Sequence, residues 1–263
     1  MRARRTLLLT LAAIVGGSAL PAMAGSIMPS FATVPAGWVT DRYQPDQFAN
    51  VGTFQGRTDV LGIGISSADS SPNRPGGQQG SFYNTQGMQY ALSGGPDSWL
   101  SADLWIPVEW SDPVANGHAR SDMWGVMTDG TAVSEYSIIG FTNYGGAPRY
   151  RVWDADTANG WVDLSTSVAY DAWTSLSIQF TGSSYDYWLN GSVVYTDSTI
   201  NGTTGFQATI MQAYNFGDPS ILDANAQDYT AHWSNSVPDG GATFALLGGA
   251  LFGLVALRRK FRG

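Results

Sequence analysis

The residues best suited to hold a ligand are arginines and tryptophans spaced two apart in one short segment, Arg149-Tyr-Arg-Val-Trp153. If this segment is a β-strand, alternation places both arginines and the tryptophan on one face, and the tyrosine and valine on the other. Aromatic rings stack on sugars, and arginine offers a fork of hydrogen-bond donors. We therefore predict a glycan-binding stripe on a concave sheet face, made of Arg149, Arg151, Trp153 and Trp161. The simpler alternative is that the arginines pair with local aspartates and the tryptophan covers the sandwich edge, without any ligand.

A second candidate site follows directly, in the loop Asp154-Ala-Asp-Thr-Ala-Asn-Gly160. Carboxylate oxygens are the hard ligands that Ca²⁺ prefers. The fifth loop position is Ala158 and no glutamate stands at the twelfth, so an EF-hand is excluded. Two interpretations stay open: a structural calcium held by Asp154, Asp156 and a distant loop, or aspartates that only cap a turn. No other cofactor is expected.

Residues for catalysis are scarce. Hydrolysis of a glycosidic bond with retention needs two carboxyl groups about 5 to 5.5 Å apart. The chain has only two glutamates, Glu109 and Glu135, separated by 26 residues. It has no cysteine and only two histidines, His118 and His232, which leaves little for thiol catalysis, a zinc site or a Ser-His-Asp triad. We therefore predict a non-enzymatic domain.

The elements that must position these residues are β-strands. Ser175-Leu-Ser-Ile-Gln-Phe180 alternates apolar and polar residues, and Asn190-Gly191 joins two β-rich runs as a type I′ hairpin turn would. Further strands are predicted at 60–65, 82–83 with 88–92, 99–105, 121–127, 136–141, 147–153, 206–213 and 228–234. Long loops are predicted at 66–80, 111–120 and 154–160. Turn-forming clusters between the strands indicate one all-β antiparallel sandwich or jelly roll, with no internal repeat.

The order of three of these segments resembles the concanavalin A-like, laminin-G-type jelly roll. They are Trp173-Thr-Ser-Leu-Ser-Ile-Gln-Phe180, Tyr185-Asp-Tyr-Trp-Leu-Asn-Gly191 and Tyr229-Thr-Ala-His-Trp-Ser-Asn235, and the resemblance spans about residues 38 to 235. It implies an antiparallel jelly-roll sandwich that often holds structural calcium. Glycoside hydrolases of this fold carry an E-x-D-x-x-E strand, a pattern that this chain lacks.

The N-terminus predicts export. Arg2, Arg4 and Arg5 precede an apolar run over residues 7–20, and Ala22-Met23-Ala24 supplies a small-x-small cleavage site. We predict a signal peptide over residues 1–24, cut by signal peptidase. The general secretory route is favoured over the twin-arginine route, and a cleaved signal over an anchor helix, because the apolar run is short for spanning.

The C-terminus carries a turn motif, an apolar run and a basic tail. The run, Ala242 to Leu257, has 16 uncharged residues, just under the roughly 17 needed to span a bilayer. Val237-Pro-Asp-Gly-Gly241 before it and the arginines after it resemble the PEP-CTERM sorting signals, most closely the VPDSG variant, with Gly240 where that variant has serine. The residues that carry the resemblance are Val237, Pro238, Asp239, Gly240, Gly241, Arg258 and Arg259.

That resemblance implies processing by an exosortase, an integral-membrane enzyme, after transient association with the inner membrane of a Gram-negative-type cell. The body would then be released or attached at the cell surface. A permanent C-terminal anchor is the alternative. We therefore divide the chain into a signal peptide (1–24), a β-sandwich domain (25–236) and a sorting signal (237–263).

The net charge of the body limits the classes of molecule that it can bind. Between the two export signals stand six arginines, no lysine and 20 acidic residues, a net charge near −14. A body this acidic has too few basic residues to neutralise the phosphates of a nucleic acid, so we do not expect it to bind one. We predict an exported cell-surface or extracellular-matrix protein whose non-catalytic sandwich binds or associates with polysaccharide. The alternatives are a polysaccharide hydrolase or lyase, and a purely structural envelope protein.

Overall fold

The computed structural model describes residues 26–219 and 228–235, all within one compact unit, Met23–Pro238. The predicted signal peptide and the predicted sorting signal lie outside the described residues. Within the described part of the chain, no helix is both long and apolar enough to cross a membrane.

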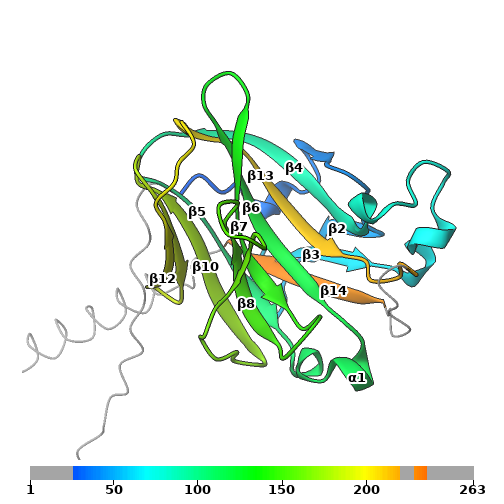
Figure 1. The fold of residues 1–263 in the computed structure, drawn as a ribbon. Helices are drawn as coiled ribbons and strands as arrows, with labels where there is room; N and C mark the ends of the chain where they lie inside the picture. The colour runs from blue at the N-terminus through cyan, green and yellow to red at the C-terminus, as the bar shows by residue number, and fades with distance from the viewer. Residues whose placement is uncertain (1–25, 220–227, 236–263) are drawn as a thin grey trace, which may run out of the picture. The chain divides into compact units, whose positions relative to one another are not determined.

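Two antiparallel sheets of seven strands each form the described fold (Figure 1). The first, called the β6 sheet, has the spatial order β1 (Trp38–Thr40), β4 (Thr85–Gly94), β13 (Gly205–Tyr214), β6 (Arg120–Thr128), β7 (Val133–Thr142), β8 (Arg149–Trp153) and β9 (Trp161–Asp163). The second, called the β10 sheet, has the order β12 (Ser192–Asp197), β11 (Tyr185–Leu189), β10 (Ala172–Phe180), β5 (Ser98–Ile106), β14 (Tyr229–Ser234), β3 (Leu61–Ile65) and β2 (Gln47–Asn50).

The chain passes repeatedly between the two sheets, because β3, β5 and β14 lie in one sheet while β4, β6 and β13 lie in the other. Neighbouring strands are therefore often far apart in sequence. The predicted fold class, an all-β antiparallel sandwich of the jelly-roll type, is confirmed.

The core lies between the sheets and follows the period-2 pattern of the strands. Leu176, Ile178 and Phe180 of β10 are all buried, as predicted from their alternation. Burying each such side chain contributes about 1.5–3 kcal/mol. A side-chain hydrogen bond also links the two sheets through the core. Trp233 Nε1 of β14 donates to Ser121 Oγ of β6 at 2.9 Å.

The Asn190-Gly191 hairpin has the predicted turn geometry. Both residues have positive φ, 49° and 78°, which is what a type I′ turn requires. The turn joins β11 to β12, whose pairing is shifted by a bulge between Tyr187 and Trp188.

The sequence prediction was wrong or incomplete at several short elements. Phe82 and Tyr83 do not form a strand but lie in a 3₁₀ turn, η4 (Ser81–Asn84). The strands β1, β2 and β9 were missed, because three or four residues are too few to show a period. The predicted loop at 111–120 contains a short helix, α1 (Pro113–Asn116). It forms because the Asp112 side chain accepts hydrogen bonds from two backbone amides of its first turn.

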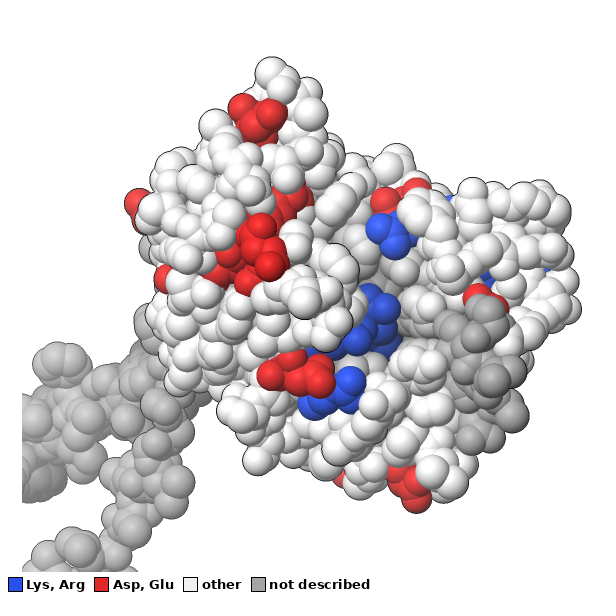
Figure 2. All heavy atoms as spheres, in the orientation of Figure 1, with Lys and Arg blue, Asp and Glu red and all other residues white. Residues whose placement is uncertain are grey.

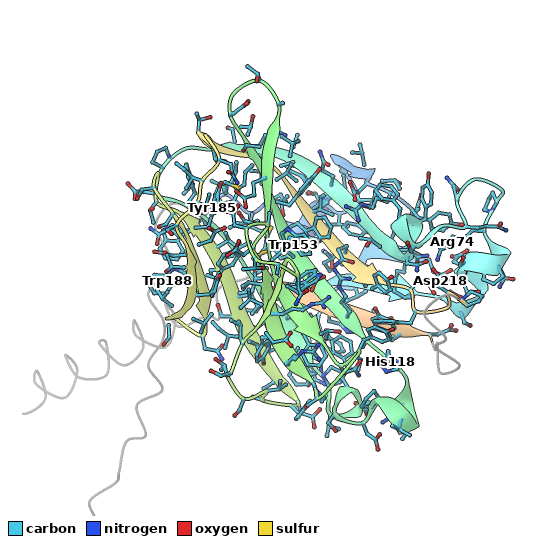
Figure 3. All side chains as sticks on the ribbon, viewed as in Figure 1. Arg74, His118, Trp153, Tyr185, Trp188 and Asp218 are labelled. Carbon is cyan, nitrogen blue, oxygen red and sulfur yellow. The ribbon has the colours of Figure 1, made fainter. Side chains whose placement is uncertain are left out.

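Four further 3₁₀ turns complete the described elements: η1 (Phe31–Thr33), η2 (Ser67–Asp69), η3 (Ser71–Asn73) and η5 (Val108–Ser111). The segment that holds η2, η3 and η4 projects beside the sandwich, in cyan at the right of Figure 1. Arg74 anchors it, because this buried guanidinium donates to Asp69 O at 2.8 Å and to Asn84 Oδ1 at 2.6 Å. Asn84 in turn donates to Asp218 Oδ2 at 2.7 Å, and Figure 3 shows Arg74 and Asp218 close together at this end of the molecule.

Candidate functional site

The outer face of the β6 sheet, the face turned away from the core, carries three adjacent rows of side chains. The strand register defines each row, because directly paired residues lie side by side. The apolar row contains Gln89, Ile210, Trp124, Ile138, Trp153 and Trp161. The polar row contains Gly87, Gln212, Asp122, Gly140, Arg151 and Asp163. The arginine row contains Arg120, Thr142 and Arg149.

Glycine makes room for the polar row. A side chain at Gly140 would collide with the carboxylate of Asp122, and one at Gly87 would collide with Gln212. The two glycines therefore leave space on both sides for a buried carboxylate and a buried amide. In an ordinary strand, larger side chains would fill that space.

Asp122 is the centre of a hydrogen-bond cluster on this face. It is fully buried, and its Oδ2 accepts from Arg120 Nε at 2.6 Å and from Gln212 Nε2 at 2.5 Å. Its other oxygen, Oδ1, has no hydrogen-bond partner among the described residues, and neither does Gln212 Oε1. Buried polar atoms without a partner are uncommon in folded proteins. The cluster therefore has hydrogen-bonding capacity left over.

Arg151 adds an unpartnered donor beside this cluster. Only 8% of the residue is exposed, and its Nε has no hydrogen-bond partner among the described residues. Its guanidinium stacks 3.7 Å from the centre of the Trp161 ring, and that of Arg120 lies 4.8 Å from the same ring. Burial, together with the neighbouring positive charge of Arg120, lowers the pKa of Arg151 to about 9.

The remaining arginines of this face have acidic partners. Arg149 Nε lies 2.8 Å from Asp163 Oδ1, at the rim of the face. Arg42, from the segment after β1, pairs with Asp41 at 3.3 Å and covers the ring of Trp124 at 4.8 Å. Four of the six arginines of the body thus gather over one face, and Figure 2 shows basic side chains in a hollow at the centre of this view.

The predicted stripe lies within this face, and its two tryptophans have different surroundings. Trp153 and Trp161 form an edge-to-face pair with ring centres 5.1 Å apart. The Trp153 ring packs tightly over Gly160, which has a positive φ of 70°, and also against the small apolar cluster around Trp124. Trp153, labelled in Figure 3, therefore mainly packs against its own protein, whereas the guanidinium of Arg151 stacks on the ring of Trp161. Glycan binding by Arg149, Arg151, Trp153 and Trp161 stays a prediction.

Sequence reasoning missed the strand neighbours of this stripe. Arg120, Asp122 and Trp124 alternate on β6, in the same i, i+2 pattern that drew attention to β8. That pattern was a usable signal. The sequence around Gln212 gave no such signal, because only the register between β13 and β6 places Gln212 beside Asp122.

The predicted calcium aspartates lie at a different place, at the β8–β9 loop. Carboxylate oxygens of Asp154, Asp156 and Asp197 all lie within 4.8 Å of one another, so the end of β12 supplies the distant partner. Asp197 is 3% exposed, and its Oδ2 has no hydrogen-bond partner among the described residues. Burial, followed by the charge of Asp197, raises the pKa of nearby Glu135 to about 7. These oxygens are of the kind that Ca²⁺ binds, and calcium here stays a prediction.

The β10 sheet has aromatic side chains on its own outer face. Trp105 and Trp173 pair there with ring centres 5.6 Å apart, and Arg57 lies 4.9 Å over the Trp173 ring. Trp99 and Trp188 form a second pair at 5.0 Å. Arg57 is bound to Asp103 at 2.5 Å. Among the described residues, this face carries no second arginine.

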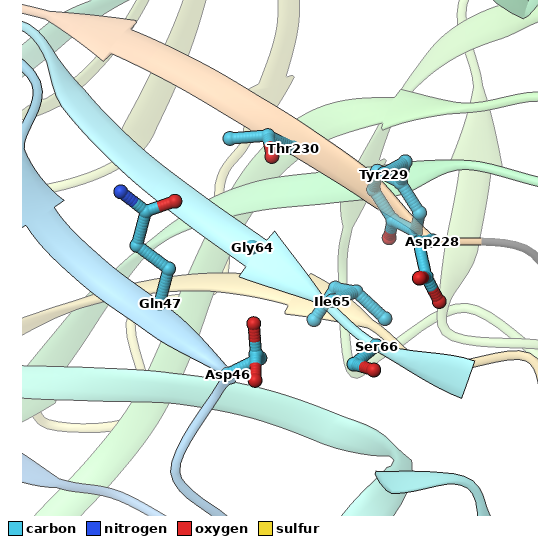
Figure 4. A pocket seen from close by; sticks show the side chains of 8 residues that line it. All are labelled: Asp46, Gln47, Gly64, Ile65, Ser66, Asp228, Tyr229 and Thr230. Atoms are coloured by element: carbon cyan, nitrogen blue, oxygen red, sulfur yellow. The ribbon is translucent and has the colours of Figure 1, made fainter. Parts of the chain in front are cut away.

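A pocket at the edge of the β10 sheet has a different character (Figure 4). Its lining residues are Asp46, Gln47, Gly64, Ile65, Ser66, Asp228, Tyr229 and Thr230. The backbone amide of Ser67 donates to Asp228 and lowers the pKa of that carboxyl. This lining has neither a tryptophan nor an arginine, so it lacks the stacking and donor groups of the outer face of the β6 sheet.

Comparison with known proteins identifies the C-terminal motif. Residues 236–261 match the VPDSG-CTERM motif, which indicates an exported, envelope-directed protein. No curated protein matches the chain in sequence.

Among solved structures, similar folds occur in carbohydrate-related proteins. A prokaryotic β-1,3-1,4-glucanase (lichenase) from a mouse hindgut metagenome is 10% identical, with a TM-score of 0.46 over 78% of this chain and 94% of that one. The β-glucanase of Bacillus licheniformis is 11% identical, with a TM-score of 0.44 over 81% and 97%. The carbohydrate-binding module CBM66 of Bacillus subtilis is 12% identical, with a TM-score of 0.36 over 72% and 93%.

Proposed function

We propose that this protein is an exported surface or matrix protein whose β-sandwich binds extracellular polysaccharide on the outer face of the β6 sheet, without cleaving it. One observation carries the proposal. Buried polar atoms of Asp122, Arg151 and Gln212 have no hydrogen-bond partner in the described part of the chain, and they lie on a face that also holds Trp161.

The arrangement suits a sugar because it combines two kinds of contact. The apolar row provides aromatic surface at Trp124, Trp153 and Trp161, and the polar row beside it provides a donor and two acceptors. Sugar rings have apolar faces and hydroxyl edges, so one ring can stack while its hydroxyls reach the neighbouring row. Asp122 Oδ1, Gln212 Oε1 and Arg151 Nε are buried in this structure, so binding requires the side chains over them to move aside. Sugar hydroxyls can then donate to the two oxygens and accept from Nε.

The carboxylates of this face favour binding over hydrolysis. Asp122 is bound by Arg120 and Asp163 by Arg149. Glycoside cleavage needs two carboxyl groups placed on either side of the scissile bond, whereas both carboxylates of this face are held in ion pairs with arginine. A hydrolase or lyase on this fold is the alternative, and product formation distinguishes the two.

For export, we propose that signal peptidase cuts before Gly25, and that an exosortase-type enzyme of a Gram-negative-type cell processes residues 237–263 after transient anchoring in the inner membrane. The match of residues 236–261 to the VPDSG-CTERM motif supports this proposal.

The test is binding of the full chain to a glycan array, with reducing-end and unsaturated-end assays on every polymer that binds. We expect binding without product release. Trp161→Ala should weaken binding about tenfold or more, since alanine truncation of a tryptophan at the centre of a binding site costs about 2 kcal/mol or more. Trp188→Ala, on the other sheet, is the matched control and should bind as the parent does. Product release from any polymer would favour the enzyme alternative, and absence of binding to any glycan would favour a purely structural role.

A further inference from the structure

We infer that the polysaccharide bound on the outer face of the β6 sheet is anionic, carrying carboxylate or sulfate groups. This inference rests on the proposed function and names its ligand class. The observation behind it is the placement of the arginines in an otherwise acidic body.

The arginines are concentrated far beyond what the composition suggests. The body has six arginines against 20 acidic residues, and Arg42, Arg120, Arg149 and Arg151 all lie over this one face. In Figure 2, the larger acidic patch lies away from the central hollow where the basic side chains gather, and one smaller acidic group lies at the edge of that hollow. An acidic protein that only needed solubility would have no reason to collect its few cations in one place.

The negative net charge does not prevent anion binding at this site. At physiological ionic strength the Debye length is about 8 Å, so acidic groups on other faces are largely screened. Arginines in direct contact with a ligand, and partly shielded from water, are screened much less. The charges that contact the ligand therefore decide which ligand binds, whereas the net charge of the body affects only long-range attraction and repulsion.

Within the arginine group, Arg151 is the one whose charge is not neutralised. Arg120 has Asp122 and Arg149 has Asp163 as direct partners. No carboxylate of the described residues lies within ion-pair distance of Arg151, which is 92% buried, since 8% of it is exposed. Among the charges around it, that of Arg120 affects the pKa of Arg151 most, and the carboxylates of Asp122 and Asp163 act in the opposite direction. A buried cation beside a second cation is costly unless an anion joins them.

The ligand can supply that anion. Trp161 stacks on the flat side of the Arg151 guanidinium and holds it in place, so little side-chain freedom is lost when its edge binds. The free Nε belongs to that edge. A planar guanidinium edge matches carboxylate and sulfate oxygens, and such charge-assisted hydrogen bonds are about twice as strong as neutral ones.

The experiment compares three polymers on the full chain by affinity electrophoresis or calorimetry: polygalacturonate for carboxylate, dextran sulfate for sulfate, and dextran as the neutral control. We expect at least one anionic polymer to bind about tenfold or more tightly than dextran, and that advantage to fall strongly in about 1 M NaCl, where the Debye length is about 3 Å. Preference for one anionic polymer over the other identifies which anion the site takes.

Variants locate the effect. Arg151→Gln should remove the preference for the anionic polymer, and Arg151→Lys should keep part of it, because the charge remains while the fork is lost. Arg149→Gln, at the more exposed rim, serves if Arg151→Gln does not fold, and should reduce the preference. Arg57→Gln, on the other sheet, is the matched control and should leave the preference intact.

The outcomes separate this inference from the proposed function. If neutral polymers bind as tightly as anionic ones, the anionic specificity is wrong and polysaccharide binding stands. If anionic preference survives both Arg151→Gln and Arg149→Gln, this face is not its source. If no polymer binds under any condition, both proposals fail.

Discussion

The outer face of the β6 sheet depends on individual residues whose roles differ. Asp122 binds Arg120 and Gln212, and Gly140 leaves the space that this carboxylate occupies. Arg151 has no ion-pair partner among the residues that the structure describes. These roles predict different outcomes for substitutions of similar size.

Gly140→Ala tests the space beside Asp122. A methyl group there would collide with the buried carboxylate and the neighbouring strand, so we expect a loss of about 1–3 kcal/mol in the free energy of unfolding, together with weaker glycan binding. Chemical denaturation measures the first effect. Gly95→Ala is the control, because nothing lies within 4 Å of its added methyl group. Equal stability of the two variants would contradict the collision.

His232 predicts how stability depends on pH. Burial lowers the pKa of this histidine below its ordinary value, so the fold favours the neutral ring, which stacks on Phe54 at 3.8 Å. Above an ordinary pKa of about 6.5, folded and unfolded states are both neutral and no penalty arises. As pH falls below that value, the unfolded chain gains the proton first and stability declines.

The measurement is the denaturation midpoint at several values of pH between about 7.5 and 5. His232→Gln should show a smaller decline over this window than the parent. An identical decline in both proteins would assign the pH dependence to other groups.

At the scale of elements, two segments far apart in the sequence meet at the acidic cluster. The β8–β9 loop supplies Asp154 and Asp156, and the end of β12 supplies Asp197. Tyr195 donates to Asp154 Oδ2 at 2.6 Å. Asp197 Oδ2 has no hydrogen-bond partner among the described residues. A bound cation would hold these segments together.

We expect Ca²⁺ to raise the unfolding temperature of the full chain, by the equivalent of about 2.7 kcal/mol at 100-fold excess over its Kd. EDTA should reverse the effect and Mg²⁺ should give less, because Mg²⁺ demands a stricter geometry. Asp197→Asn should lose the increment, and Asp46→Asn, on the β2 side, should keep it. A calcium effect that is equal in both variants would rule out the cluster as its source.

The predictability of each strand followed from its length. Strands β5, β11 and β12 were predicted within one residue of their observed bounds, and the C-terminal end of β10 was predicted correctly, because five to nine residues are enough for alternation or a turn signal to emerge. Strands β1 and β9 have three residues each and could not be detected in that way. The aromatic pair Phe82-Tyr83 suggested a strand, yet Phe82 instead lies 4.5 Å from the guanidinium of Arg42. Tertiary contact here outweighed local propensity.

At the scale of the whole molecule, the distribution of charge fits an exported protein that binds a ligand on one face. A net charge near −14 in the body keeps an exported protein soluble, while the arginines over one face allow local anion binding. The basic residues outside the body belong to the two predicted export signals.

Mass spectrometry of the protein recovered from its exporting cell tests the processing. We expect the chain to begin at Gly25 and to end near Val237–Gly241, with the basic tail removed. Replacing Arg258 and Arg259 by Gln should slow this removal and leave the longer chain in the membrane fraction. A chain that retains its C-terminus through Gly263 in the parent protein would indicate a permanent anchor instead.

The sequence by itself determined the charge of the body, the C-terminal sorting motif and which side chains of β8 share a face. These properties are local: a sorting motif is a linear string, and alternation needs only a few neighbouring residues. The tertiary structure alone decided that Asp122 and Gln212 lie beside Gly140 and Arg151 on one face. That row joins strands far apart in the sequence: Gln212 and Asp122, which form a 2.5 Å hydrogen bond, are separated by 90 residues. The register that aligns these strands depends on how all of them bury their apolar sides together. That information is spread over the whole domain and is not contained in any short segment of the sequence.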